Sequence, residues 1–279
     1  MNPPFALEST TSTPIVGVLV NPSSDCRPQV QMVEAWGRGH GVEVAHLGTS
    51  AAPRDLAPDC QLVIALGGDG TILRALQLAM AHHAAVLGVN FGTVGFLADV
   101  NGDDLAGALE RIASGEAMVD ERTALATTLQ GAEPRRLIAF NDVVIARRPG
   151  HGTARLGVDV GGEAMLALKG DGVVIASPTG STAYTIGAGG PAVTPTIDAL
   201  VLTPLATQGS PVRSLVVDGR DTIRIETAPS SAPLRLEIDG RTIHDLPESA
   251  VIEICAAPRK ARLVRTRPRT FYRDLAERL

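Results

Sequence analysis

The stretch LVIALGGDGTILRAL (Leu62–Leu76) decides the fold of this chain. Five apolar residues precede the glycine-rich GGDGT (residues 67–71), and apolar residues at helical spacing follow it. A buried strand that passes through a short glycine turn into a helix is the building unit of parallel α/β sheets. The same glycines suit either a tight turn between two elements or a site at which backbone N–H groups hold phosphate.

Segments on both sides repeat this alternation. IVGVLVNP (15–22), VEVAHLG (42–48) and AAVLGVN (84–90) have the β-branched, apolar composition of buried strands, whereas VQMVEAWGRGHG (30–41) and LAGALERIASG (105–115) have helical spacing. We therefore predict an α/β N-terminal domain over residues 15–120, with a parallel sheet and helices on both faces. Ligands of such sheets bind at the carboxyl ends of the strands, which is where GGDGT lies.

The pattern of apolar and polar residues changes after residue 120. From Arg122 to Ile254 the chain consists of short alternating apolar and polar runs, separated by Gly, Pro and Ser clusters. This pattern predicts an antiparallel, all-β C-terminal domain over residues 121–256. Residues 1–14 are polar and proline-rich and are expected to be mobile. Residues 257–279 form a C-terminal segment that ends in a helix, since RTFYRDLAERL (269–279) is amphipathic.

Composition excludes several classes of function. The net charge is −5 over 279 residues, so nothing favours a nucleic-acid or acidic-membrane partner. Three cysteines are dispersed without metal-ligand spacing, which is typical of reduced thiols in a cytoplasmic protein. No apolar run approaches the ~20 residues that cross a bilayer. We expect a soluble, cytoplasmic protein without a membrane partner.

The chemistry is expected in three segments. Asp69 lies inside a phosphate-type turn, where a carboxylate is useful only if it accepts a proton or holds a metal. KGDGVVIASPTGSTAYTIGAGGP (169–191) is dense in small residues and hydroxyls, which suits a groove for a base or ribose but also a simple Ser/Thr-rich loop. Tyr184 in that segment either stacks on a base or closes the core. Asn141 and Asp142 either hold sugar hydroxyls or open a strand with an Asx turn.

Five motifs together resemble the bacterial NAD kinases. GGDGT, NFGTVGFLADV (90–100), FNDVV (140–144), GDGVVIASPTGSTAYTIGAGGP (170–191) and LTPL (202–205) occur in that family's order and at similar separations, and the resemblance spans essentially the whole chain. It implies an α/β domain and an all-β, NAD-binding domain, with the C-terminal helix packing back on the first. It also implies a homodimer or homotetramer that phosphorylates the 2′-hydroxyl of the adenosine ribose of NAD, with ATP or polyphosphate as donor and Mg²⁺ or another divalent cation.

The resemblance also implies roles for individual residues. Asp69 corresponds to the family's proton acceptor, and we expect residues 67–71 to cradle the donor phosphates. No residue is assigned as a metal ligand. The positions that correspond to substrate or nucleotide contacts are Gly67, Gly68, Gly70, Thr71, Arg74, Phe96, Asn141, Asp142, Lys169, Asp171, Thr179, Thr182, Ala183, Tyr184, Gly187, Ala206 and Arg241.

Departures from the family pattern leave alternatives open. Asp142 stands where the family usually has a glutamate, so its carboxylate is one methylene shorter, and Gly187 replaces a residue that carries a hydroxyl. These changes leave open whether NAD or NADH is preferred. The GGDGT motif is also similar to that of lipid and other small-alcohol kinases, so such a kinase is the second hypothesis. A nucleotide-binding regulator without catalysis is the third.

Overall fold

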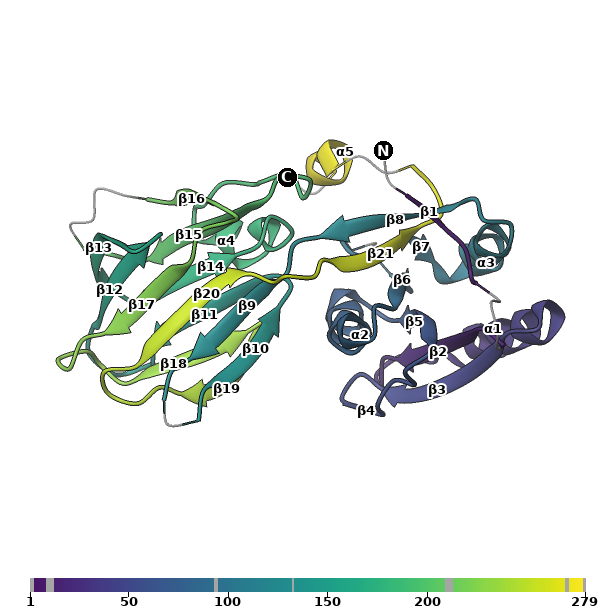
Figure 1. Cartoon of the computed structure of the whole chain (residues 1–279), viewed down its shortest axis with the longest axis horizontal. Coiled ribbons are helices and arrows are strands. Elements are labelled where there is room, and N and C mark those ends of the chain that lie inside the picture. Colours follow the sequence, from purple (N-terminus) through teal and green to yellow (C-terminus); the bar gives the residue numbers. More distant parts are fainter. Residues whose placement is uncertain are drawn as a thin grey trace. The chain divides into compact units, whose positions relative to one another are not determined.

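A computed structural model describes residues 3–8, 13–92, 95–131, 133–208, 213–268 and 271–277. The chain forms two compact units (Figure 1). The first, called the α/β unit, comprises Met1–Glu121 and Ala261–Leu279, and the second, called the β unit, comprises Arg122–Lys260. The α/β class of the first and the antiparallel all-β class of the second agree with the predicted fold class.

A nine-stranded sheet forms the centre of the α/β unit. Its order is β1-β8-β21-β6-β5-β2-β3-β4, with β7 paired to β6. The four strands β2 (Ile15–Val20), β3 (Glu43–Thr49), β5 (Cys60–Leu66) and β6 (Ala85–Asn90) run parallel. All six residues of β6 are buried, as expected for a parallel strand with both faces covered.

Three helices cover this sheet. They are α1 (Arg27–His40), α2 (Asp69–Ala81) and α3 (Leu105–Ala113), the last preceded by the short helix η1 (Gly102–Asp104). Strands β2 and β5 are adjacent in the sheet. After β2 the chain passes through α1 to β3 on one side of this pair, and after β5 it passes through α2 to β6 on the other side. Right-handed crossovers then place α1 and α2 on opposite faces, and the strand order reverses between β2 and β5. Helix α1 ends at Gly41, whose φ of +65° is the left-handed cap conformation that glycine favours.

Short strands complete the sheet, and some of them were not predicted. They are β1 (Pro4–Phe5), β4 (Ala52–Pro53), β7 (Val100–Asn101), β8 (Ala117–Arg122) and β21 (Ala261–Arg265). Phe5 is buried and β1 pairs with β8, although these residues fall in the segment expected to be mobile. The end of the chain returns to the first unit as a strand, β21, which pairs parallel with β6. The C-terminal helix α5 (Phe271–Ala276) forms as predicted but has no buried residue among those described.

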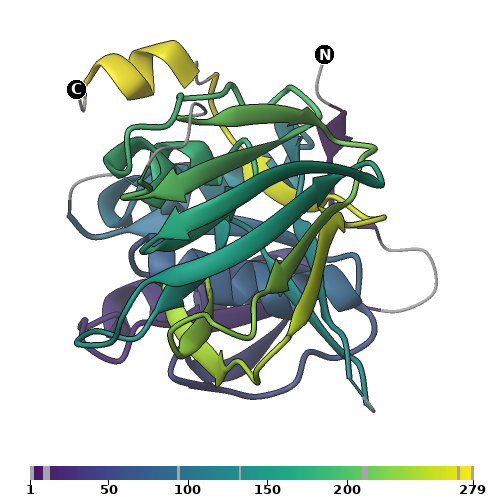
Figure 2. The ribbon, with the colours of Figure 1, turned by 90° about the vertical axis from the view of Figure 1, so that its left-hand side faces the viewer.

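Two six-stranded antiparallel sheets make up the β unit (Figures 1 and 2). One has the order β10-β9-β20-β17-β12-β13 and the other β16-β15-β14-β11-β18-β19. Their inward side chains form one apolar core. The strands are β9 (Leu125–Leu129), β10 (Arg135–Ala139), β11 (Asp142–Arg147), β12 (Ala154–Val160), β13 (Glu163–Gly170), β14 (Gly172–Ala176), β15 (Ala199–Leu205), β16 (Leu215–Asp218), β17 (Ile223–Thr227), β18 (Leu234–Ile238), β19 (Arg241–Asp245) and β20 (Val251–Ala256).

The central strands of the second of these sheets are buried on both faces. Every residue of β14 and β15 is buried, whereas a sheet with one solvated face would alternate. Val144, Val174 and Val201 form a separate cluster with Val193, and Ala188 packs against it. The hydroxyl-rich segment 177–193, with the short helices η2 (Gly180–Thr182) and α4 (Tyr184–Gly187), therefore packs on this sheet.

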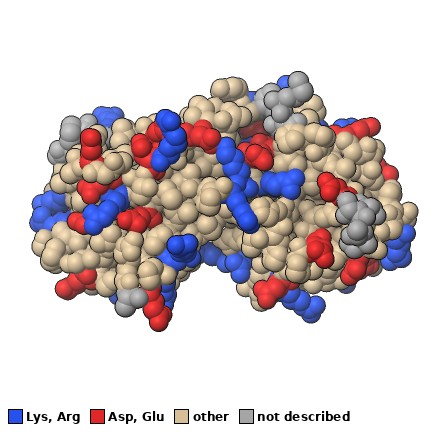
Figure 3. Space-filling view, in the orientation of Figure 1, with Lys and Arg blue, Asp and Glu red and all other residues tan. Residues whose placement is uncertain are grey.

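No helix within the described residues is long and apolar enough to span a membrane. Acidic and basic side chains are interspersed with uncharged ones on the face seen in Figure 3.

Candidate active site

The packing around the glycine turn after β5 shows which of its glycines the fold requires and which leave open space. A Cβ on Gly67 would lie 2.5 Å from the Thr71 hydroxyl and 2.8 Å from the Asn21 Cβ, so packing within the chain excludes a larger residue. At Gly68 and Gly70, by contrast, a Cβ would meet no described atom within 4 Å. Gly67 is therefore required by the fold. The other two leave open space at the start of α2, where the first backbone N–H groups have no intrahelical partner.

Asp69 is the first residue of α2. Its carboxylate accepts hydrogen bonds from the backbone N–H groups of Phe96, at 3.0 Å, and Leu97, at 3.3 Å. A Cβ on Gly95 would lie 1.8 Å from Asp69 Oδ1, so only glycine permits this approach. Phe96 is expected from the resemblance to contact substrate or nucleotide, and in the structure its backbone N–H contacts Asp69.

Arg265, the last residue of β21, and Thr266, which follows it, hold the segment 97–99 in place. The guanidinium of Arg265, which is 5% exposed, donates to the carbonyls of Leu97 and Ala98 at 3.0 and 3.3 Å. Thr266 donates both its backbone N–H and its hydroxyl to Asp99, at 2.9 and 2.6 Å. Sequence reasoning missed Gly95, Arg265 and Thr266, because their contacts join segments more than 160 residues apart or involve only the backbone.

Two further predicted residues lie on α2. Thr71 is buried, and its backbone N–H donates to the carbonyl of Gly68 at 2.9 Å. Arg74 is half-buried, and its guanidinium donates to Gln77 on the same helix at 2.8 Å. Arg74 therefore lies one helical turn past Gly70.

In the β unit, a missed carboxylate organises the turn between β10 and β11. Asp239 accepts hydrogen bonds from the N–H groups of Phe140 at 3.0 Å, Asn141 at 2.7 Å and Asp142 at 3.3 Å. Asp239 has a φ of +48°, an unusual backbone conformation for a residue other than glycine. Its signal in the sequence is the Asp-Gly pair of EIDG (237–240).

Asp142 is buried, and the Tyr184 N–H donates to its carboxylate. Burial raises the pKa of Asp142 to about 7, and the nearby carboxylates of Asp239 and Glu237 also raise it, whereas the Tyr184 hydrogen bond opposes them. A Cβ on Gly180 would lie 1.9 Å from the Asn141 carbonyl. The structure thus brings residues 141 and 142 together with the segment 180–184, which are predicted site segments far apart in the sequence.

Only part of the hydroxyl-rich segment is available to a ligand. Ser177 and Ser181 are fully buried, and their hydroxyls donate to the carbonyls of Phe140 and Pro178 at 2.5 and 2.6 Å. These two serines hold the loop together and do not line a groove. Thr182 donates to the Thr179 carbonyl at 3.2 Å. Buried Thr179 has a hydroxyl without a hydrogen-bond partner among the described residues.

A cavity of about 410 Å³ lies beside this segment and is lined by the predicted residues Asp171, Tyr184 and Ala206. The Tyr184 side chain is 47% exposed, so the alternative that it closes the core is wrong. Arg147, which was not predicted, also lines the cavity, and its Nε donates to Asp171 Oδ1 at 2.6 Å. Ala206 has a φ of +44° at the rim.

The second glycine motif, residues 170–172, is not a turn of the GGDGT kind. Asp171 alone separates β13 from β14, so the chain passes there from one sheet to the other. A Cβ on Gly172 would lie 2.1 Å from the Ile145 carbonyl, which explains that glycine by packing. Four further predicted residues lie outside the cavity lining and are exposed, namely Lys169 on β13, Ala183 and Gly187 at the two ends of α4, and Arg241 at the start of β19.

Metal-ligating side chains are not clustered in the described part of the chain. No group of three or more His, Cys, Asp or Glu residues has the geometry to hold an ion there. A divalent cation with several phosphate and water ligands needs only one or two protein carboxylates. The described residues thus provide no all-protein cage for an ion.

Comparisons with known proteins cover nearly the whole chain. Residues 25–117 match the model of the ATP-NAD kinase N-terminal domain, and residues 140–266 match that of the ATP-NAD kinase C-terminal domain. An NAD kinase of Heliobacterium modesticaldum is 35% identical over 95% of this chain and 98% of its own length, and one of Symbiobacterium thermophilum is 35% identical over 90% and 91%.

Two solved structures share the fold. A yeast NADH kinase complexed with NADH has a TM-score of 0.84 at 22% identity, covering 96% of this chain and 88% of its own. An NAD kinase from Archaeoglobus fulgidus in complex with ATP has a TM-score of 0.75 at 22% identity, covering 94% and 97%.

Proposed function

Because this chain belongs to the ATP-NAD kinase family, we propose that it phosphorylates the 2′-hydroxyl of the adenosine ribose of NAD with ATP, giving NADP and ADP. The observation that carries this proposal is the Asp69 carboxylate, fixed by two backbone N–H groups beside a glycine turn with open space at Gly68 and Gly70. A positioned carboxylate next to a phosphate-type turn is what transfer to an alcohol requires.

Asp69 acts as the general base. Each of its carboxylate oxygens accepts one N–H and retains a second lone pair, which is free to accept a proton. As the 2′-oxygen forms its bond to the γ-phosphorus, its proton passes to Asp69, and the bond from the γ-phosphorus to the bridging β,γ-oxygen breaks. ADP leaves with that electron pair.

The glycine turn holds the donor phosphates. Residues 68–70 present backbone N–H groups at the N-terminus of α2, where the helix dipole favours negative charge. The absence of side chains at residues 68 and 70 lets phosphate oxygens approach the backbone closely. A divalent cation bound to the same phosphates would neutralise their charge, and no step here depends on a protein ligand for it.

The dinucleotide is bound by the β unit. Asn141 and Asp142 offer an amide and a carboxyl group to ribose hydroxyls, and the pKa of about 7 lets Asp142 donate when protonated and accept when ionised. The 410 Å³ cavity beside Tyr184 is large enough for a planar ring, with Asp171 as a polar partner on its wall.

The decisive experiment mixes purified protein with ATP, Mg²⁺ and NAD and measures NADP. We expect NADP with the wild type and a fall in kcat of about 10²–10⁴-fold in Asp69→Asn, with NAD affinity retained. Asp55→Asn, an exposed carboxylate in the same unit, is the matched control. Near-normal turnover by Asp69→Asn would exclude it as the base. NAD binding by the wild type without NADP formation would instead favour a regulator.

The family resemblance also supports a homodimer or homotetramer in the cytoplasm. Light scattering coupled to gel filtration measures the molar mass directly, against 29.0 kDa for one chain. A mass of one chain at assay concentrations would refute this part of the proposal.

A further inference from the structure

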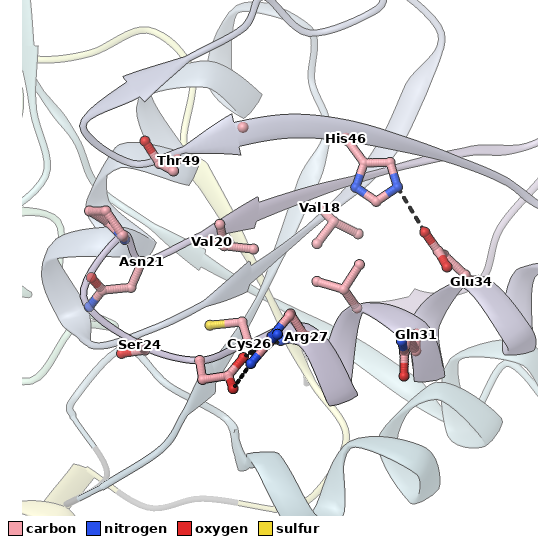
Figure 4. Close-up of a pocket in the computed structure, with 14 residues that line it drawn as sticks. Val18, Val20, Asn21, Ser24, Cys26, Arg27, Gln31, Glu34, His46 and Thr49 are labelled. Carbon is pink, nitrogen blue, oxygen red and sulfur yellow. Dashed lines mark hydrogen bonds and ion pairs between the residues drawn. The ribbon is translucent and has the colours of Figure 1, made fainter.

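A second cavity, of about 530 Å³, lies in the α/β unit and takes no part in the mechanism above (Figure 4). It is formed by the end of β2, the loop that leads into α1, the first turns of α1 and the end of β3. Its apolar lining comes from Val18 and Val20 on β2 and Val30 on α1. Polar side chains, among them Asn21, Gln31 and Thr49, surround this apolar surface.

Charged side chains of the lining are paired with one another. Arg27 Nη2 lies 2.8 Å from Asp25 Oδ2, and the pKa of that carboxyl is lowered to about 2 by this hydrogen-bonded guanidinium. His46 Nε2 lies 2.9 Å from Glu34 Oε1, as the dashed lines of Figure 4 mark. The cavity thus offers apolar surface and neutral hydrogen-bonding groups, with its one arginine already paired. That combination suits an uncharged, planar group better than a polyanion.

The cavity and the glycine turn are neighbours because Asn21 lines the cavity and also packs against Gly67. The backbone N–H of Asn21 donates to the Leu66 carbonyl at 2.9 Å, and a Cβ on Gly67 would lie 2.8 Å from the Asn21 Cβ. Val20 at the end of β2 pairs with Leu66 at the end of β5. This is the point where the strand order reverses, and open α/β sheets bind their ligands outside the carboxyl ends of the strands there.

We propose that this cavity binds the purine nucleoside of the phosphoryl donor, with the base against the three valines and the ribose hydroxyls at the polar rim. The inference rests on the proposed function, in which the triphosphate lies at residues 67–71. Asn21 both lines the cavity and packs against Gly67, so a nucleotide whose phosphates occupy that turn has the cavity directly beside it. Inorganic polyphosphate has no nucleoside, so the cavity distinguishes the two donor classes.

The test fills the cavity with Val30→Phe. The control is Ala35→Phe, which creates the same side chain at an exposed position of α1 outside the lining. We expect Val30→Phe to weaken ADP binding and raise the KM for ATP by about tenfold or more. The affinity for NAD, and the rate with inorganic polyphosphate if the wild type uses it, should stay unchanged. ADP binding within twofold of the wild type in a folded Val30→Phe would overturn the proposal.

Photolabelling of the wild type keeps the proposal testable if Val30→Phe does not fold. 2-Azido-ATP should label the tryptic peptides that end at Arg38 and Arg54, since both contribute to the lining, and ADP should compete while NAD should not. Labelling elsewhere would overturn the site. These readouts need no turnover, so a wild type that binds ATP in the cavity but forms no NADP would contradict the proposed function and leave this inference standing.

Discussion

Replacing Gly95 by alanine would test whether the backbone clamp on Asp69 is what catalysis requires. The new Cβ would lie 1.8 Å from Asp69 Oδ1, 2.3 Å from its Cγ and 2.5 Å from Oδ2. Real Cβ atoms essentially never come closer than 3.0 Å to another heavy atom, so Oδ1 and Cβ must separate by at least about 1.2 Å. The Phe96 and Leu97 hydrogen bonds to the carboxylate cannot both survive that displacement.

The size of the effect follows from that displacement. Misplacing a catalytic group by ~1 Å costs about 10²-fold in rate, so we expect kcat for NADP formation to fall by about that factor. The loss of one hydrogen bond to a charged acceptor lowers the free energy of unfolding by about 1.5–3 kcal/mol, and we expect the variant to stay folded. The KM for NAD should change little, because the residues proposed to bind it lie in the β unit.

The assay compares steady-state NADP formation, thermal unfolding and NAD affinity in three proteins. Gly107→Ala in α3 is the control, since a Cβ there meets nothing within 4 Å. We expect Gly107→Ala to retain wild-type kcat. If Gly95→Ala also keeps wild-type kcat with an unchanged unfolding temperature, then the clamped position of Asp69 is not needed and the reasoning is refuted.

Two further predictions concern buried charges. The raised pKa of Asp142 means that the folded protein retains a proton that the unfolded chain releases between pH 3.8 and about 7, so the stability that Asp142 contributes falls across this window and levels off above it. Relative to Asp142→Asn, the wild type should lose at most about 4 kcal/mol between pH 4 and pH 8 in denaturant titrations, and a constant difference would contradict this. Arg265→Met leaves Asp99 and Asp120 without this partner and should lower the free energy of unfolding by about 3–5 kcal/mol. Arg262→Met on the same strand, half-buried, should cost less than about 1 kcal/mol in the same measurement.

Local patterns were enough to predict the elements around the glycine turn. Strands β2, β5 and β6 are runs of apolar residues closed by glycine, asparagine or proline, and α1 and α2 have helical spacing, so each is defined by neighbours in the sequence. Strand β21 was not predicted, because ARLVR (261–265) becomes a strand only through pairing with β6 and β8, which are far away in the chain.

The same distinction holds for the site. Asp69 was predictable because a carboxylate inside a glycine turn is unusual on local grounds alone. Asp239 and Arg265 were missed because they bind backbone groups of residues about 100 and 170 positions away. Where a turn needs a distant acceptor, or a carbonyl needs a distant donor, the local sequence does not indicate which residue supplies it.

The position of β21 in the α/β sheet has a consequence for how the protein is made. Until Ala261–Arg265 leave the ribosome, the first unit lacks the strand that lies between β8 and β6, and both edges stay unpaired. The β unit is contiguous and can close first. At roughly 5–20 residues per second, the nascent first unit waits on the order of ten to thirty seconds with those edges exposed. Nascent chains stalled before residue 261 are therefore the form of this protein that most needs chaperone protection.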